Sequence, residues 1–122
     1  MFRLLIGAVA AGTIVATAIP RADAAELVYV FEPGCAYCRL WDREIAPVYP
    51  KTAEAARAPL QAIDKRDPAL ASLKLASPVR YTPTFVLMEK GAELGRIEGY
   101  PGEDFFWGRL AALLERLPDL TQ

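Results

Sequence analysis

The chain has 122 residues, a formal net charge of −1 and no histidine, and Cys35 and Cys38 are its only cysteines. This length suits one small domain, and without a basic cluster the protein is a poor candidate for binding nucleic acid or an anionic membrane surface. A four-coordinate zinc site needs more nitrogen and sulfur ligands than this composition offers. The two cysteines are therefore the main candidates for carrying the function of the protein.

The first 24 residues are typical of a secretory signal peptide. They carry the basic residue Arg3, continue with an apolar or small stretch over residues 4–19, and end in Ala22-Asp23-Ala24, an A-x-A cleavage pattern. The apolar stretch has 16 residues (19 − 4 + 1), fewer than the about 20 that a membrane-spanning helix needs. We expect residues 1–24 to be removed on export to the periplasm, with an uncleaved membrane anchor as the alternative. Residues 25–122 should form one domain.

This domain opens with a strand that leads directly to the two cysteines. Residues 27–31 are apolar, with β-branched and aromatic side chains, as expected for a strand covered on both faces. Cys35-Ala36-Tyr37-Cys38 then begins a helical pattern, in which unpaired N–H groups and the helix dipole stabilise a thiolate at the first cysteine. The second cysteine lies one turn on, close enough to form a disulfide. The pattern indicates a dithiol/disulfide switch.

Two other uses of the cysteine pair remain open. A purely structural disulfide would close a very short loop and stabilise the fold little, because the entropy of loop closure grows with loop length. A copper(I) dithiolate needs only two soft thiolates, so a copper-binding module is the second alternative. The redox interpretation is favoured over both.

The remaining elements alternate between helical and strand patterns. Tyr37, Trp41, Ile45 and Val48 form the apolar stripe of the first helix, which Pro47 should kink or end. The next strand should pair in parallel with the first, and the last two strands should form an antiparallel hairpin. We expect a helical piece over residues 49–57, a strand over 59–64, a short helix over 68–75, strands over 84–88 and 94–98, and a helix over 103–117.

The predicted order, β-α-β, short α, β-β-α, resembles the thioredoxin fold in its minimal form. This is an α/β fold with a central mixed sheet and helices on both faces. The resemblance covers residues 25–122, and its most specific features are the Cys35-Ala36-Tyr37-Cys38 motif and Thr82-Pro83, which matches the cis-proline of the family. Residues 32–35, 41–45 and 96–105 are similar to periplasmic thioredoxin-like proteins of bacterial sulfur oxidation, the SoxS type.

The two cysteines should have different roles. Cys35 follows a glycine that lets a partner's backbone approach closely, so it should be the attacking thiolate. Cys38 lies deeper in the helix and should be the resolving thiol that releases the mixed disulfide. The resemblance implies that no cofactor and no metal are needed.

Four further residues are candidates for binding the substrate protein. The resemblance implies that Thr82 offers its backbone to an extended partner peptide, beside Pro83. Tyr100 should lie in a third wall of the same groove. Tyr37 is the fourth candidate, with a partly buried ring over the disulfide as the alternative.

The sequence departs from thioredoxin at one pair of positions. Thioredoxin has a buried aspartate in the strand before the motif and a lysine on the next strand, and the matching positions here are Tyr29 and Leu60. Both charges are absent together, which predicts an apolar arrangement. The proton of Cys38 must then leave through water, Glu32 or Tyr37.

The leading hypothesis is a monomeric periplasmic thiol–disulfide reductase. It would reduce exported cysteine-containing proteins, with a sulfur-carrier protein as one candidate, and the resemblance implies re-reduction by an inner-membrane electron donor. A disulfide isomerase or oxidase is the alternative within the enzyme class, and the copper-binding dithiol module is the alternative outside it.

Overall fold

The computed structural model describes residue 12 and residues 24–118. The predicted signal peptide therefore lies almost entirely outside the described residues. Among the residues described, no helix combines the length and apolar character needed to cross a membrane. The elements are β1 (Glu26–Phe31), α1 (Ala36–Glu44), the 3₁₀ helix η1 (Tyr49–Lys51), α2 (Ala53–Arg57), β2 (Leu60–Asp64), the 3₁₀ helix η2 (Pro68–Ser72), β3 (Thr84–Glu89), β4 (Ala92–Glu98) and α3 (Glu103–Leu114).

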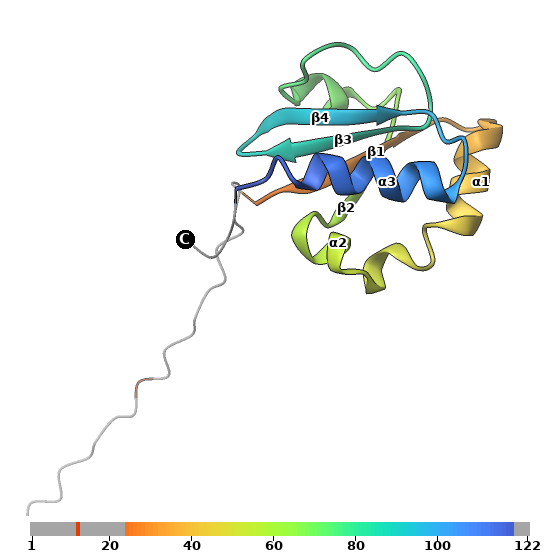
Figure 1. Ribbon diagram of the computed structural model, residues 1–122. Coiled ribbons are helices and arrows are strands. Elements are labelled where there is room, and N and C mark those ends of the chain that lie inside the picture. The colour runs from red at the N-terminus through yellow and green to blue at the C-terminus, as the bar shows by residue number, and fades with distance from the viewer. Residues whose placement is uncertain (1–11, 13–23, 119–122) are drawn as a thin grey trace, which may run out of the picture.

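The four strands form one mixed sheet in the order β2-β1-β3-β4 (Figure 1). β1 pairs in parallel with β2 and antiparallel with β3, and β3 forms an antiparallel hairpin with β4. β1 and β3 are the central strands, which explains why both are almost continuously apolar and buried. The structure confirms the predicted α/β fold and both predicted strand pairings.

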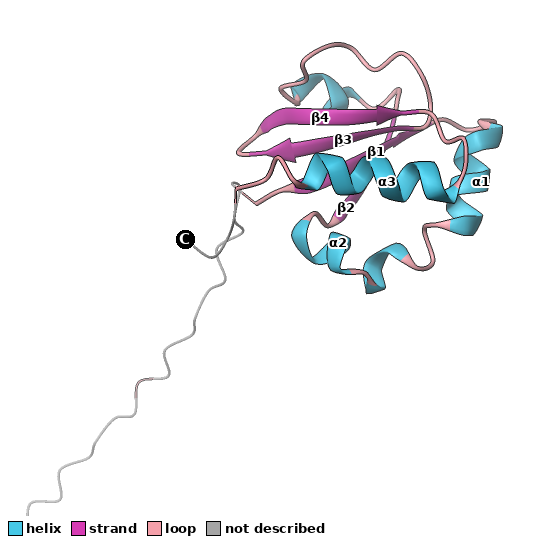
Figure 2. Ribbon diagram, viewed as in Figure 1, coloured by secondary structure: helices cyan, strands magenta, loops and turns pink. Residues whose placement is uncertain are grey.

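The first face of the sheet carries the larger core, which α1 and α3 cover (Figure 2). Trp41 of α1, Phe85 of β3 and Phe106 of α3 meet at its centre, and all three are 0% exposed. The ring centroids of Trp41 and Phe85 lie 5.0 Å apart, and those of Phe85 and Phe106 lie 4.9 Å apart. This aromatic cluster fixes α1, and with it the cysteine motif, on the sheet.

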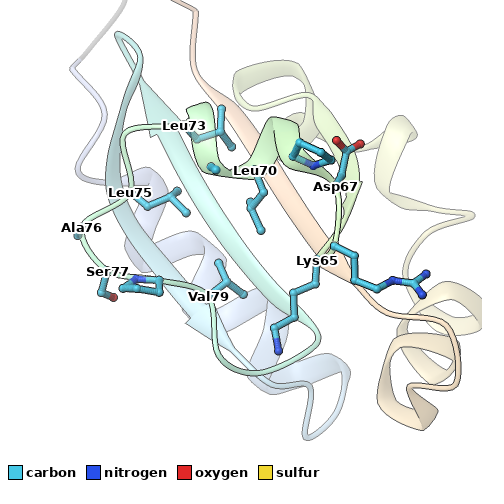
Figure 3. Close-up of a pocket in the computed structure, with 12 residues that line it drawn as sticks. Lys65, Asp67, Leu70, Leu73, Leu75, Ala76, Ser77 and Val79 are labelled. Carbon is cyan, nitrogen blue, oxygen red and sulfur yellow. The ribbon is translucent and has the colours of Figure 1, made fainter.

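The second face is covered by η2 and the chain that follows it. Val28, Val30 and Val86 of the sheet pack there against Leu70 and Val79. A pocket in this segment is lined by residues between Lys65 and Val79, and neither cysteine lines it (Figure 3).

Several helices are shorter than predicted. The final helix ends at Leu114 instead of Leu117, because Arg116 and Leu117 donate to carbonyls three residues back and tighten the chain into a turn. The short helix after Asp67 is a 3₁₀ helix that ends at Ser72, and Lys74 then forms a bridge with Ala92 at the edge of the hairpin. The sheet thus recruits residues that the local pattern assigns to a helix.

The apolar stripe of the first helix is only half correct. Trp41 and Ile45 are buried as predicted, whereas Tyr37 is 61% exposed and Val48 is 45% exposed. Tyr37 lies in the first turn of α1, and Val48 follows the end of the helix and so leaves its periodicity. The alternative of a partly buried Tyr37 ring over the disulfide is therefore wrong.

An ion pair anchors the segment over the second face. The Arg96 guanidinium binds Glu93 and also donates to the Ser77 carbonyl oxygen at 2.7 Å. The Ala76 N–H in turn donates to Glu93 Oε1 at 3.1 Å. The hydrogen bond from Arg96 is the main cause that holds the pKa of Glu93 below its usual value.

This ion pair predicts a pH-dependent contribution to stability. Because the Glu93 pKa is lower in the folded than in the unfolded protein, its contribution is present above the unfolded pKa and is lost as pH falls through the folded one. Glu93→Gln should lower the free energy of unfolding at pH 7, and the difference from the wild type should shrink below about pH 4.5. Urea unfolding at pH 7 and pH 3 measures this, with the exposed Glu115→Gln as the control. An equal difference at both pH values would contradict the prediction.

Candidate active site at the N-terminus of helix α1

A tight turn brings the chain from β1 to the cysteines. Gly34 has a φ of +84°, a left-handed conformation that glycine adopts without steric cost, and the Cys35 N–H donates to the Glu32 carbonyl oxygen at 3.3 Å. Cys35 then takes the N-cap position of α1. This geometry places the first sulfur at the exposed end of the helix.

Cys35 and Cys38 form a disulfide, with their Cα atoms 5.2 Å apart. The two residues differ in access to solvent, since Cys35 is half-buried and Cys38 is 3% exposed. The Cys38 N–H lies 3.1 Å from Cys35 Sγ and donates to it, and the first turn of α1 holds no acidic residue. The helix N-terminus therefore favours negative charge on Cys35 in the dithiol state.

The loop before β3 lies at the same end of the sheet as the loop that leads from β1 to the cysteines. The Thr82–Pro83 peptide bond is cis, Pro83 is buried, and its carbonyl oxygen accepts from the Gly99 N–H at 2.7 Å. The Thr82 hydroxyl donates to Glu32 Oε1 at 3.2 Å, which ties this loop to the turn before Cys35. The loop is thus held on both of its sides.

Lys65 extends this contact to a third loop. Its ammonium lies 3.4 Å from Glu32 Oε1 and donates to the Arg80 carbonyl oxygen at 3.1 Å. Glu32, one of the predicted routes for the Cys38 proton, links the loops after β1 and β2 and the loop before β3. Its pairing with Lys65 and Thr82 joins residues far apart in the chain, so local patterns do not reveal it.

A helix-terminal disulfide beside a cis-proline loop on a β2-β1-β3-β4 sheet matches the predicted resemblance. A family model described as a thioredoxin-like domain matches residues 16–114, more than half of the chain. The chain belongs to the thioredoxin-like family. With its Cys35–Cys38 disulfide, this thioredoxin-like protein is a thiol–disulfide oxidoreductase.

Solved structures place the thioredoxin-like protein more narrowly. It is similar to the periplasmic thioredoxin SoxS from Paracoccus pantotrophus, with 54% identity over 75% of this chain and 97% of that chain and a TM-score of 0.72. A thioredoxin from Thermus thermophilus is 24% identical (74% and 73% covered, TM-score 0.57) and shares the fold. So does the germline-specific thioredoxin Deadhead from Drosophila melanogaster, at 21% identity (75% and 82% covered, TM-score 0.58). No curated protein sequence matches the chain.

One predicted binding residue of the thioredoxin-like protein is not available to a partner. Tyr100 is 2% exposed, and its hydroxyl donates to Glu44 Oε1 at 3.3 Å. Burial, with nearby Glu44 and Glu103, raises the pKa of Tyr100 to about 12, so the hydroxyl stays protonated. This burial contradicts the prediction that the Tyr100 ring contacts the substrate. Tyr81, which the sequence reasoning missed, is 61% exposed next to Thr82.

The apolar arrangement predicted below the cysteines is also wrong. Tyr29 is 4% exposed, and its hydroxyl donates to Asp42 Oδ1 at 2.9 Å and lies 3.3 Å from the Cys38 carbonyl oxygen. Leu60, the other position compared with thioredoxin, lies opposite Leu27 in the sheet. A polar contact therefore connects β1 with α1 directly behind the motif.

No cluster of three or more histidine, cysteine, aspartate or glutamate side chains within the described part of the chain could hold a metal ion. Cys35 and Cys38 are the soft ligands that a copper(I) dithiolate would use, and in this structure they are joined to each other.

Proposed function

We propose that this protein is a periplasmic reductase of disulfides in exported proteins, with Cys35 as the attacking and Cys38 as the resolving residue. The observation that carries the proposal is the difference between the two sulfurs. Cys35 is half-buried at the helix N-terminus, where a partner can reach it, and Cys38 is 3% exposed. The signal-peptide pattern of residues 1–24 and the 54% identity to a periplasmic thioredoxin support the location.

The reaction transfers two electrons from the dithiol to the partner. The Cys35 thiolate attacks one sulfur of the partner disulfide, and the other partner sulfur leaves as a thiolate that takes up a proton. Cys38 then loses its proton and attacks Cys35 Sγ, which breaks the mixed disulfide and releases the second partner thiol. The protein is left as the Cys35–Cys38 disulfide, and an inner-membrane electron donor returns it to the dithiol.

The substrate protein binds as an extended segment beside the cysteines. Thr82 offers its backbone next to Pro83, and the Glu32 contact to the Thr82 hydroxyl supports a fixed position for this loop. Tyr37, in the first turn of α1 and 61% exposed, offers an apolar surface next to the two cysteines. We further propose a monomer whose partners include a protein of sulfur oxidation, which the similarity to the SoxS type supports.

The reduction potential separates a reductase from an oxidase or isomerase. Couples on this fold range from about −270 mV in thioredoxin to about −120 mV in a strong periplasmic oxidant. That oxidant has a histidine between its cysteines, whereas this chain has Ala36-Tyr37, so we expect a potential nearer to −270 mV.

Equilibration of the purified protein with dithiothreitol or glutathione buffers, followed by thiol alkylation, measures this potential. A value near −120 mV would contradict the reductase and favour disulfide formation or exchange. Retention of copper(I) at one ion per protein against a competing chelator would instead support the copper-binding module.

A further inference from the structure

The Tyr29 hydroxyl is held at a single place behind the cysteine motif. Its ring stacks on Phe85 with centroids 5.1 Å apart and packs against Trp41 at 4.5 Å. These rings leave the side chain no room to turn, so the hydroxyl stays between Asp42 Oδ1 and the Cys38 carbonyl oxygen. Its single hydrogen is therefore shared between the helix backbone at Cys38 and a carboxylate.

Asp42 occupies the position one turn after Cys38 on α1. Residues four apart on a helix are neighbours on its surface, with about 5–6 Å between their Cβ atoms. Within the described residues, Asp42 forms no ion pair, and its carboxylate accepts a hydrogen bond from the Tyr29 hydroxyl. Asp42 is solvent-exposed, so a proton that it accepts can pass to water.

The other charged groups around the motif are paired with other residues or are exposed to solvent. Glu32 is paired with Lys65, and Glu44 accepts from the Tyr100 hydroxyl. β3 supplies no charged side chain before Glu89, at its far end. The remaining charged residues of α1 and α3 are exposed, namely Arg39, Arg43, Glu103, Asp104 and Arg109.

We propose that Tyr29 is a positioning residue that holds the Asp42 carboxylate behind Cys38, and that Asp42 accepts the proton of Cys38 when the mixed disulfide is resolved. This rests on the proposed role of Cys38 as the resolving thiol. Burial, the hydrogen bond to Asp42 and its charge raise the pKa of Tyr29 above its usual value. Tyr29 therefore stays protonated at physiological pH and acts only as a hydrogen-bond donor.

The proton on Cys38 Sγ passes to the Asp42 carboxylate and from there to water. The electron pair left on Cys38 Sγ forms the bond to Cys35 Sγ, and the bond between Cys35 and the partner sulfur breaks. The partner sulfur leaves with the electron pair of this broken bond and takes up a proton from solvent.

The test follows the resolving step alone. Cys35 of the reduced protein attacks an aromatic disulfide, such as dithiobis(nitrobenzoate), which releases a first thionitrobenzoate. The release of the second thionitrobenzoate, on closure of the Cys35–Cys38 disulfide, is recorded between pH 6 and pH 10. Asp42→Asn should slow this release about 100-fold at pH 6.5, the lower end of what a general base contributes. At pH 10 its rate should return to within about twofold of the wild type, because hydroxide then removes the thiol proton.

Tyr29→Phe should slow the release about fivefold at pH 6.5, since one hydrogen bond to the carboxylate is lost. The double variant should be no slower than Asp42→Asn, because Tyr29 acts through Asp42. Tyr49→Phe is the matched control: Tyr49 is also fully buried, and its hydroxyl donates to the Ala58 carbonyl oxygen at 2.6 Å, away from the motif. Asp104→Asn is the control for an exposed helical carboxylate.

Three results would overturn the proposal. The first is a pH profile of the release rate that is the same for Tyr29→Phe and Tyr49→Phe. The second is an Asp42→Asn variant whose release stays slow at pH 10. The third is an Asp42→Asn variant whose release is faster than that of the wild type at pH 6.5. The last result would mean that Asp42 only opposes the Cys38 thiolate. Each leaves the proposed function intact as long as Cys38→Ser still accumulates the mixed disulfide on Cys35.

Discussion

Cys38→Ser should convert the protein into a trap for its substrates, whereas Cys35→Ser should form no adducts. Once Cys35 has attacked a partner, only Cys38 is positioned to break the mixed disulfide, so its removal leaves the intermediate stable. Cys35 is accessible at the N-cap of α1, and Cys38 is 3% exposed, so a partner disulfide cannot approach the second sulfur in the same way. Both variants should lose catalytic disulfide reduction completely.

The adducts are measured in cells that express each variant with residues 1–24 in place. Periplasmic and cytoplasmic fractions of these cells are resolved on non-reducing gels. Adducts that disappear on reduction should be found with Cys38→Ser and should be missing with the double variant Cys35→Ser/Cys38→Ser. Equal amounts of adduct with Cys35→Ser and Cys38→Ser would show that the assigned roles are wrong. Adducts confined to unprocessed, cytoplasmic protein would contradict the proposed location.

Phe106→Ala should be the most destabilising of the single substitutions considered. Phe106 is 0% exposed, and its ring lies 4.9 Å from Phe85 and 5.7 Å from Trp41. Truncation removes contacts to α1 and to the sheet at once, and a cavity of this kind costs about 3–5 kcal/mol. Since small domains have about 5–15 kcal/mol in total, the melting temperature should fall steeply.

The neighbouring residue provides a matched control. Phe105 is the same residue type in the same helix turn but is 43% exposed, so Phe105→Ala should cost only about 0.5 kcal/mol. Urea unfolding of both variants, followed by circular dichroism, gives the two free energies. Equal losses would contradict a core centred on Phe106.

The helix and strand pattern was largely predictable because the signals are local. The apolar run of β1 and the short turn at Gly91 indicate a buried strand and a hairpin without reference to the rest of the chain. Cys35 at the N-cap was predictable for the same reason, since a helical period begins directly after it. The cap of η2 is equally local, since the Asp67 carboxylate accepts from the Ala69 N–H at 2.9 Å.

The directions of individual side chains were less predictable. The sequence offers Tyr100 as an exposed loop tyrosine, but packing against Phe106, with centroids 6.3 Å apart, buries it. Tyr37 has the spacing of a core residue and is exposed, although Cys38, its neighbour in the first turn of α1, is buried. Helical spacing identifies which residues share one face of a helix. How many of them are buried depends on the elements that pack against that face.

The sequence by itself determined the class of chemistry: two cysteines three residues apart at a helix start, with no histidine and no other thiol in the chain. Only the tertiary structure decided what surrounds them. The Tyr29–Asp42 contact spans 13 residues and the Thr82–Glu32 contact spans 50. Such contacts depend on how α1 and the loops pack on the sheet. Propensity and periodicity act over a few residues, so they cannot specify which distant side chains meet.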